Sequence, residues 1–191
     1  GHSTHSWERF LELLGQHRIE VVVDVRSSPY SAWTPQFNRE PLKATLRTAQ
    51  LRYLFLGKEL GARRSERECY VEGIAQYERI AQTPAFKAGL QRVITGAQSF
   101  RLALMCAEKD PLECHRTLLV CRHLRQAVTI QHIHADGALE SQAEAEKRLM
   151  QEERVPTEDF FTSPEALLER AYDQRGQKAA YRESTEPAPP V

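Results

Sequence analysis

The chain has 191 residues, 41% of them hydrophobic, which is enough for one folded domain with an appendage. Its apolar runs stay well short of the roughly 20 residues that a membrane-spanning helix needs, and no secretory signal is visible. We therefore expect a cytoplasmic protein with no membrane partner. Its four cysteines match neither a disulfide scaffold nor a paired zinc motif, so free thiols are expected: Cys69, Cys106, Cys114 and Cys121.

The formal net charge of zero hides two parts of opposite sign. Residues 1–137 contain 19 Lys and Arg against 14 Asp and Glu, a balance of +5, whereas residues 138–191 contain 7 against 12, a balance of −5. The basic residues are densest between Arg26 and Arg67. This favours a small anionic ligand over duplex nucleic acid, which would need a larger basic surplus. Ordinary solvated side chains are the alternative interpretation.

Helices and strands alternate along the first part of the chain. An amphipathic helix is expected after Ser6, which is placed to cap it. The apolar run "IEVVVDVR" then predicts a strand buried on both faces. Further strands are expected in "LRYLFLG", "FRLALMC" and "AVTIQHIHAD", with helices from Pro41 to about Gln50 and from Thr83 and Pro84 onwards. Residues 27–38 predict a loop, and "KELGARRSERE" predicts a mobile or ligand-binding segment.

This alternation predicts an α/β fold over residues 1–137, with three layers: a mainly parallel sheet and helices on both of its faces. Residues 138–175 predict an acidic helical extension that contains one charged helix and a shorter helix from Ser163 to about Tyr172. Residues 176–191 are poor in core-forming side chains, so a disordered tail is expected there.

The stretch "LMCAEKDPLECHRTLL" concentrates the reactive side chains. Asp110 and Pro111 match the N-cap and first position of a helix, and Glu113 is placed to reach back to the cap amide. This interpretation makes Asp110 and Glu113 capping residues rather than catalytic ones. Cys106 ends a buried strand just before this helix, where α/β proteins bind ligands.

The thiol of Cys106 has two interpretations. A nearby helix N-terminus together with Lys109 and Arg116 would lower its pKa, which suits a nucleophile. The alternative is a small buried packing residue, because free cysteine is among the most buried residue types. Cys114 and Cys121 share one helical face with Leu118, which favours a core position for both.

His115 and Arg116 are expected on neighbouring faces of the same helix, where they either meet a ligand or remain solvated. A metal site is a further alternative, since Cys106, Cys114, His115 and His2 are suitable ligand types. The spacing Cys-x7-Cys-His is not a standard zinc spacing, however.

Two further sets of candidate residues lie at the end of a predicted strand and at the start of a predicted helix. Asp24 and Arg26 point to the same side of their strand, where they either orient a ligand or pair with each other. His2, Ser3 and Thr4 precede the first helix and offer an imidazole, hydroxyls and amides to an anion, with ordinary capping as the alternative.

Five stretches in this order together resemble the DUF488 family: "GHSTHSWERF", "VVVDVRSSPYS", "YLFLGKELG", "ALMCAEKDPLECHR" and "VTIQHI". The resemblance spans about residues 1–134 and implies a compact α/β domain with a shared site. It implies no reaction, because the family is named for lacking an assigned function. The family's motif residues match here at Gly1, His2, Ser3, Thr4, Asp24, Arg26, Pro29, Gly57, Leu60, Gly61, Cys106, Glu108, Cys114, His115 and Arg116.

One departure from the family concerns the start of the sequence. Members usually carry a short apolar strand before the "GHST" stretch, whereas this sequence begins at that glycine. Either such a strand lies ahead of the numbering or the sheet lacks it, and in the second case the position of His2 would differ. A weaker similarity to rhodanese-like domains rests on "VVVDVR" and a later cysteine. Glu108 and Asp110 argue against that chemistry, because carboxylates there would repel an anion.

We therefore predict an enzyme acting on a small anionic substrate, nucleotide-like molecules among the candidates. The catalytic candidates are Cys106, Glu108, His115 and His2. The substrate-binding candidates are Ser3, Thr4, Asp24, Arg26, Lys109, Arg116, Tyr30 and Trp33, the two aromatic residues lying on a loop that would close over a flat ring. The alternatives are a non-catalytic module that binds a ligand or single-stranded nucleic acid, and the metal-dependent site. The sequence identifies no cofactor and no oligomeric state.

Overall fold

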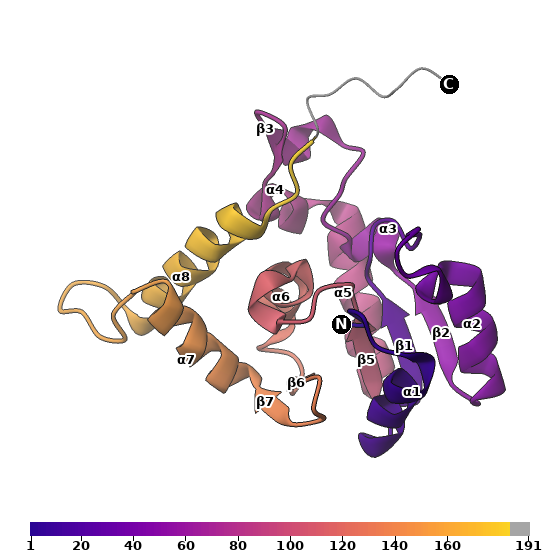
Figure 1. Cartoon of the computed structure of the whole chain (residues 1–191). Helices are drawn as coiled ribbons and strands as arrows, with labels where there is room; N and C mark the ends of the chain where they lie inside the picture. Colours follow the sequence, from indigo (N-terminus) through magenta and orange to yellow (C-terminus); the bar gives the residue numbers. More distant parts are fainter. Residues whose placement is uncertain (184–191) are drawn as a thin grey trace.

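The computed structural model describes residues 1–183 and has a parallel three-stranded sheet (Figure 1). Its strands are β1 (Val21–Asp24), β2 (Arg52–Phe55) and β5 (Leu102–Met105), in the order β2-β1-β5. The central strand β1 pairs in parallel with both neighbours, and all of its residues are buried. A continuous run of valines suits such a strand because both of its faces meet apolar layers.

Helices cover both faces of this sheet. Val22 packs in one core with residues of α1 (Trp7–Gln16) and α2 (Arg39–Thr48). Val21 and Val23 point the other way, into a core shared with α3 (Gly57–Leu60) and α5 (Pro84–Ala97). This alternation along β1 follows from the two-residue repeat of a strand. The predicted mixed α/β fold with a parallel sheet and helices is confirmed.

The remaining elements are mostly short. In chain order they are η1 (Pro35–Phe37), η2 (Arg67–Cys69), β3 (Tyr70–Val71), β4 (Ile74–Ala75), α4 (Tyr77–Gln82), η3 (Pro111–Glu113), η4 (Arg116–Cys121), α6 (Arg122–Leu124), β6 (Gln131–Ile133), β7 (Leu139–Ser141), α7 (Gln142–Glu152) and α8 (Pro164–Ala179). Within the described part of the chain, no helix has both the length and the apolar character needed to cross a bilayer.

The C-terminal elements form an arm beside the sheet, with α7 and α8 side by side in Figure 1. Leu149 of α7 and Tyr172 of α8 belong to the hydrophobic core that also holds Val23, so the acidic segment is packed rather than detached. Helix α8 continues to Ala179, beyond the end expected from the sequence and into the expected tail. Residues 184–191 of that tail lie outside the described residues.

Two expectations about local structure were wrong. The segment expected to join the parallel sheet after the "CHR" stretch instead forms β6, which pairs antiparallel with β7, because a cavity separates it from β5. The polar segment that begins at Lys58 was expected to be either mobile or ligand-binding, and the first of these alternatives is wrong. It forms α3 and η2, and the buried guanidinium of Arg64 bonds to Glu66 and to the carbonyl oxygens of Lys58 and Glu59.

Candidate functional site

The chain between β5 and η4 brings two cysteines together. Asp110 caps the turn η3 as predicted, its Oδ1 accepting from the Leu112 amide at 2.8 Å. The turn then stops, and Cys114 has an extended backbone with φ −124° and ψ 135° before the wide turn η4 begins. The expectation that Cys114 shares a helical face with Cys121 was therefore wrong. The break turns Cys114 back towards Cys106 instead.

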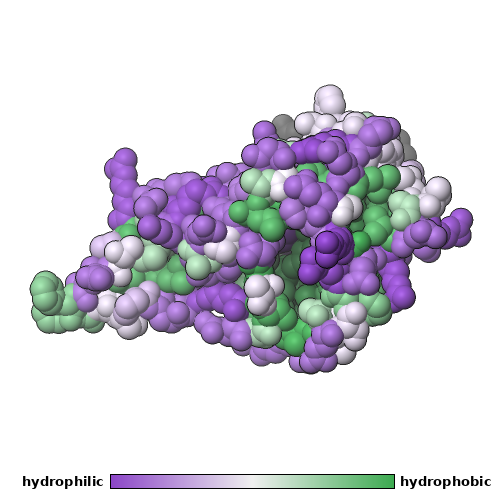
Figure 2. Space-filling model, turned by 90° about the horizontal axis from the view of Figure 1, so that it is seen from below, coloured by the Kyte–Doolittle hydropathy of each residue, from purple (hydrophilic) through white to green (hydrophobic). Residues whose placement is uncertain are grey.

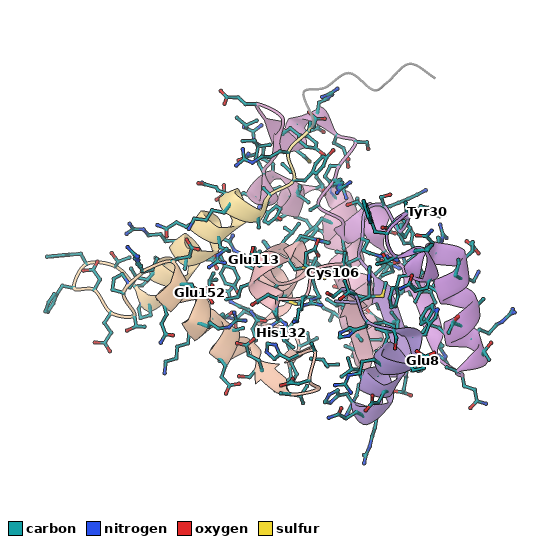
Figure 3. The ribbon with its side chains drawn as sticks, viewed as in Figure 1. Glu8, Tyr30, Cys106, Glu113, His132 and Glu152 are labelled. Atoms are coloured by element: carbon teal, nitrogen blue, oxygen red, sulfur yellow. The ribbon has the colours of Figure 1, made fainter. Side chains whose placement is uncertain are left out.

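Four side chains form what we call the thiol cluster: Cys106, Glu108, Cys114 and His115. Cys106 lies near the centre of the molecule, directly after β5 (Figure 3). Both cysteines are fully buried free thiols, and their Sγ atoms lie 2.7 Å apart. The Cys114 thiol also lies 3.0 Å from Glu108 Oε2. Because Glu108 is exposed and His115 is half-buried, one side of the cluster faces solvent.

The imidazole of His115 is oriented by the end of the central strand. Its Nε2 lies 3.0 Å from the carbonyl oxygen of Val25, the residue that follows β1. A carbonyl only accepts, so Nε2 carries a hydrogen, and in the neutral imidazole Nδ1 then has the lone pair. That Nδ1 lies 4.0 Å from Cys114 Sγ. In its neutral form His115 therefore presents an unprotonated nitrogen to the cluster.

Of the two interpretations of Cys106, the structure favours the buried packing residue over a thiol with a lowered pKa. Burial raises the pKa of this thiol well above its ordinary value, and its hydrogen bond with Cys114 adds to the rise. The positive charge of Arg116 acts in the opposite direction but is outweighed. Without a bound cation, Cys106 is thus a neutral buried thiol rather than a ready nucleophile.

Alkylation tests this directly. We expect iodoacetamide at pH 7 to label Cys106 in the native, chelator-treated protein at least about tenfold more slowly than in urea, because burial shields the sulfur from the reagent and disfavours the thiolate. Peptide mapping by mass spectrometry would quantify the labelling. Native labelling as fast as in urea would contradict the buried, neutral thiol.

Arg116 is a buried cation beside this cluster. The residue is 7% exposed, and its Nε has no hydrogen-bond partner among residues 1–183. Burial lowers its pKa, but the neighbouring Cys106 and Cys114 outweigh burial and raise it. A buried guanidinium without full hydrogen bonding is costly, so nearby negative charge would stabilise it.

A second group, the arginine cluster, consists of His2, Asp24, Arg26 and Tyr53. Arg26 donates from Nε and Nη2 to the two oxygens of Asp24, at 2.9 and 2.8 Å. Asp24 is fully buried and also accepts from the Tyr53 hydroxyl at 2.9 Å. Arg26 Nη2 further donates to the carbonyl oxygen of Phe37. Asp24 and Arg26 thus pair with each other, and the sequence reasoning missed Tyr53.

His2 belongs to this arginine cluster and is held neutral. Arg26 Nη1 lies 3.1 Å from His2 Nε2, and His2 Nδ1 donates to the Ser3 carbonyl oxygen. Burial and the charge of Arg26 lower the His2 pKa to about 4. The His2 amide donates to the carbonyl oxygen of Cys106 at 2.9 Å, so the "GHST" and "CAEKDPLECHR" stretches touch.

Residues 6–122 match the family model described as Domain of unknown function DUF488. The chain belongs to the DUF488 family. The match includes every member of both clusters except His2. No curated protein and no solved structure matches the chain, and the rhodanese-like similarity is not shown.

The other binding candidates of this DUF488 domain lie around the clusters rather than in them. Thr4 and Lys109 are exposed, and Ser3 is half-buried with a positive φ of 44°. On the loop after β1, Tyr30 is 60% and Trp33 95% exposed, and Tyr30 lies to one side of Cys106 in Figure 3. These candidates are therefore exposed polar and aromatic groups outside the two clusters.

Many of the basic residues that suggested an anionic partner have partners within the chain itself. The guanidinium groups of three arginines lie 4.4–4.7 Å from aromatic ring centres: Arg39 over Phe55, Arg52 over Phe100 and Arg63 over Tyr181. Cations stacked on aromatic faces in this way are partly committed to the fold. The charge balance alone therefore favours no nucleic-acid surface.

Proposed function

We propose that this DUF488 domain is a metal-dependent enzyme whose centre uses Cys106, Glu108 and Cys114. The observation that carries the proposal is their convergence: one ligand atom from each lies within 4.8 Å of the other two. Two thiolates and a carboxylate are ligands that zinc accepts, and soft sulfur favours it over magnesium or calcium. The Cys-x7-Cys spacing, although unusual for zinc, is compatible with metal binding. The extended backbone at Cys114 brings its thiol close to that of Cys106.

The arrangement suits a catalytic centre better than a structural one. Structural zinc sites use four protein ligands, whereas catalytic sites use three and leave a position for water or substrate. Here the exposed Glu108 opens one side of the thiol cluster to solvent. The lone pair on His115 Nδ1 lies next to Cys114, where it would take a proton from metal-bound water. Val25 would hold that histidine in the required tautomer.

Charge balance supports a cation at this position. Metal binding requires both thiols to lose their protons, which gives the three ligands three negative charges. A divalent cation leaves one negative charge over, and the buried Arg116 supplies one positive charge beside it. The same cation gives a reason for two buried thiols to converge in the core.

The substrate class in this proposal is a small anionic molecule, and the reaction class is metal-assisted hydrolysis. Lys109 supports an anionic group, because it is exposed and directly follows Glu108 in the chain. Tyr30 and Trp33 offer exposed aromatic faces on the loop that follows β1. Arg26 is not part of substrate binding here, since its donors are directed at Asp24, Phe37 and His2.

Metal content tests the centre. Purified protein dialysed against zinc is expected to retain about one zinc per chain in elemental analysis, and Cys106→Ser and Cys114→Ser less than about a tenth of that. Cys69→Ser is the matched control, because Cys69 is also fully buried but lies outside the thiol cluster. Equal zinc in all four proteins would overturn the proposal. The proposal would also be overturned if protein kept without a reducing agent had two free thiols fewer than its four cysteines allow. A Cys106–Cys114 disulfide would then occupy the site.

Turnover tests the enzymatic part separately. With p-nitrophenyl phosphate as a small anionic probe, zinc-loaded His115→Ala should lose at least about 100-fold in kcat, the usual contribution of a general base. It should still bind zinc, because the three proposed ligands remain. If the wild type binds zinc but hydrolyses neither this probe nor p-nitrophenyl acetate, the centre is structural and the enzymatic proposal is wrong.

A further inference from the structure

The loop that joins α7 to α8 carries two exposed phenylalanines. Phe160 is 101% and Phe161 98% exposed, so neither side chain packs against the described residues. Figure 1 shows this loop at the far end of the arm, and Figure 2 shows hydrophobic residues at the same end of the molecule. Single exposed apolar residues are ordinary on protein surfaces, but two adjacent phenylalanines at a projecting end indicate a contact surface.

Local contacts give this loop a defined shape. At its start Val155 is buried, and the Val155 amide donates to a carbonyl oxygen of α7 at 2.9 Å. At its end Ser163 caps α8. Between them the Thr162 hydroxyl donates to Asp159 Oδ2 at 2.6 Å, which closes a turn around the two phenylalanines. A loop that is already ordered loses little conformational entropy on binding, so its shape suits a binding role.

The charge of this loop limits what it can bind. Glu158 and Asp159 precede the phenylalanines and are exposed, and residues 155–163 contain no Lys or Arg. Two such loops would repel each other, and an anionic lipid surface would repel them as well. We call residues 158–161 the acidic tip. A partner that fits it offers an exposed aromatic or apolar group next to positive charge.

The opposite end of the molecule offers these features. Trp33 is 95% exposed on the loop after β1, and this loop leads into α2 through the N-cap Asn38. On α2, Lys43 and Arg47 are exposed and lie four residues apart, so they share one face of the helix. We call Trp33, Lys43 and Arg47 the basic surface. Figure 1 shows α2 and the loop between α7 and α8 at opposite ends of the molecule.

We infer that two copies of this chain form an antiparallel, side-by-side dimer, in which the acidic tip of each copy contacts the basic surface of the other. Complementary surfaces at opposite ends of an elongated molecule meet twice in this arrangement, so a two-fold axis closes the assembly. Each contact is small, so we expect a dissociation constant of about 1–50 µM. This inference depends on neither the proposed metal nor the proposed enzymatic activity.

Sedimentation equilibrium of the chain 1–191 in reducing buffer tests the dimer. Between about 1 and 200 µM, the mass should rise from one chain of 21.9 kDa towards two. Phe160→Ser combined with Phe161→Ser should raise the dissociation constant at least about tenfold, because the two side chains are the apolar part of the contact. Val71→Ser is the matched control, since Val71 is also exposed but lies outside both surfaces. It should leave the dissociation constant unchanged.

Charge reversal shows whether the two surfaces pair with each other. Thr157→Lys with Glu158→Lys makes the tip basic and leaves Asp159, which holds the turn, in place. Lys43→Glu with Arg47→Glu makes the basic surface acidic. Each double variant alone should stay a single chain, because like charges then face each other. A mixture of the two should form a dimer, because both contacts again join opposite charges.

Four results would overturn the inference. The first is a wild type that stays a single chain at about 200 µM. The second is an assembly that grows beyond two chains, because the contacts would then not close. The third is a dimer that the paired phenylalanine substitutions weaken no more than Val71→Ser does. The fourth is a mixture of the charge-reversed variants that does not dimerise, because the acidic tip and the basic surface would then not be partners.

Discussion

Replacing Asp24 with asparagine is expected to lower the free energy of unfolding by about 3–5 kcal/mol, the usual loss when one partner of a buried ion pair is removed. The carboxylate is fully buried and accepts from Arg26 and from the Tyr53 hydroxyl. The amide keeps the shape but leaves the guanidinium of Arg26, in a residue 7% exposed, without its counter-charge. Urea unfolding would measure the loss, and Tm should fall by roughly 6–20 °C.

The matched control for this substitution is Glu12→Gln. It makes the same carboxylate-to-amide change in the Arg9–Glu12 pair, whose oxygen and nitrogen lie 2.8 Å apart on the surface of α1. Solvent screens such pairs, so we expect a loss of at most about 1 kcal/mol. If Asp24→Asn lowered the free energy of unfolding by no more than Glu12→Gln does, the Asp24–Arg26 ion pair would not stabilise the end of β1.

The structure confirms the parts of the sequence prediction that depend on neighbouring residues. Ser6, Thr83 and Ser163 each accept a hydrogen bond from the amide three residues later, as side-chain caps do. The continuous valine run forms the central strand, because burial on both faces requires no alternation. Asp110 is a cap, as the local pattern predicted. In each case the determining contact lies within a few residues.

Contacts between distant segments could not be predicted in the same way. Cys114, Leu118 and Cys121 fit a helical repeat, but the chain around Cys114 is extended, so the repeat has no structural meaning there. Tyr53 reaches Asp24 from 29 residues away, and no local pattern marks it. Glu113 was expected to reach back to the cap, yet it pairs with Arg175 of α8. The thiol cluster likewise depends on the path of the whole loop, not on ligand spacing.

Gly57 packs closely against the chain segment that carries Val25 and Arg26, one of which contacts each cluster. Gly57, the first residue of α3, is buried against the backbone after β1. A Cβ added at Gly57 would lie 1.9 Å from the Arg26 carbonyl oxygen and 2.8 Å from its carbonyl carbon. These are backbone atoms that cannot rotate away, so Gly57→Ala must move either α3 or the segment that carries Val25 and Arg26. We expect a loss of about 3 kcal/mol, the upper part of the usual range for overpacking.

Gly15→Ala is the matched control, because a Cβ added there meets nothing within 4 Å. Gly15 lies in α1, where alanine is the better helix former, so this variant should gain up to about 1 kcal/mol. The two variants thus make the same chemical change, but we expect opposite changes in the free energy of unfolding measured in urea. Gly57→Ala should also lower the hydrolysis of p-nitrophenyl phosphate by the zinc-loaded protein, because the displaced segment includes the Val25 carbonyl that orients His115. If Gly57→Ala unfolds at the same urea concentration as Gly15→Ala, the close packing of α3 on the end of β1 is wrong, and with it the rigid support proposed for His115.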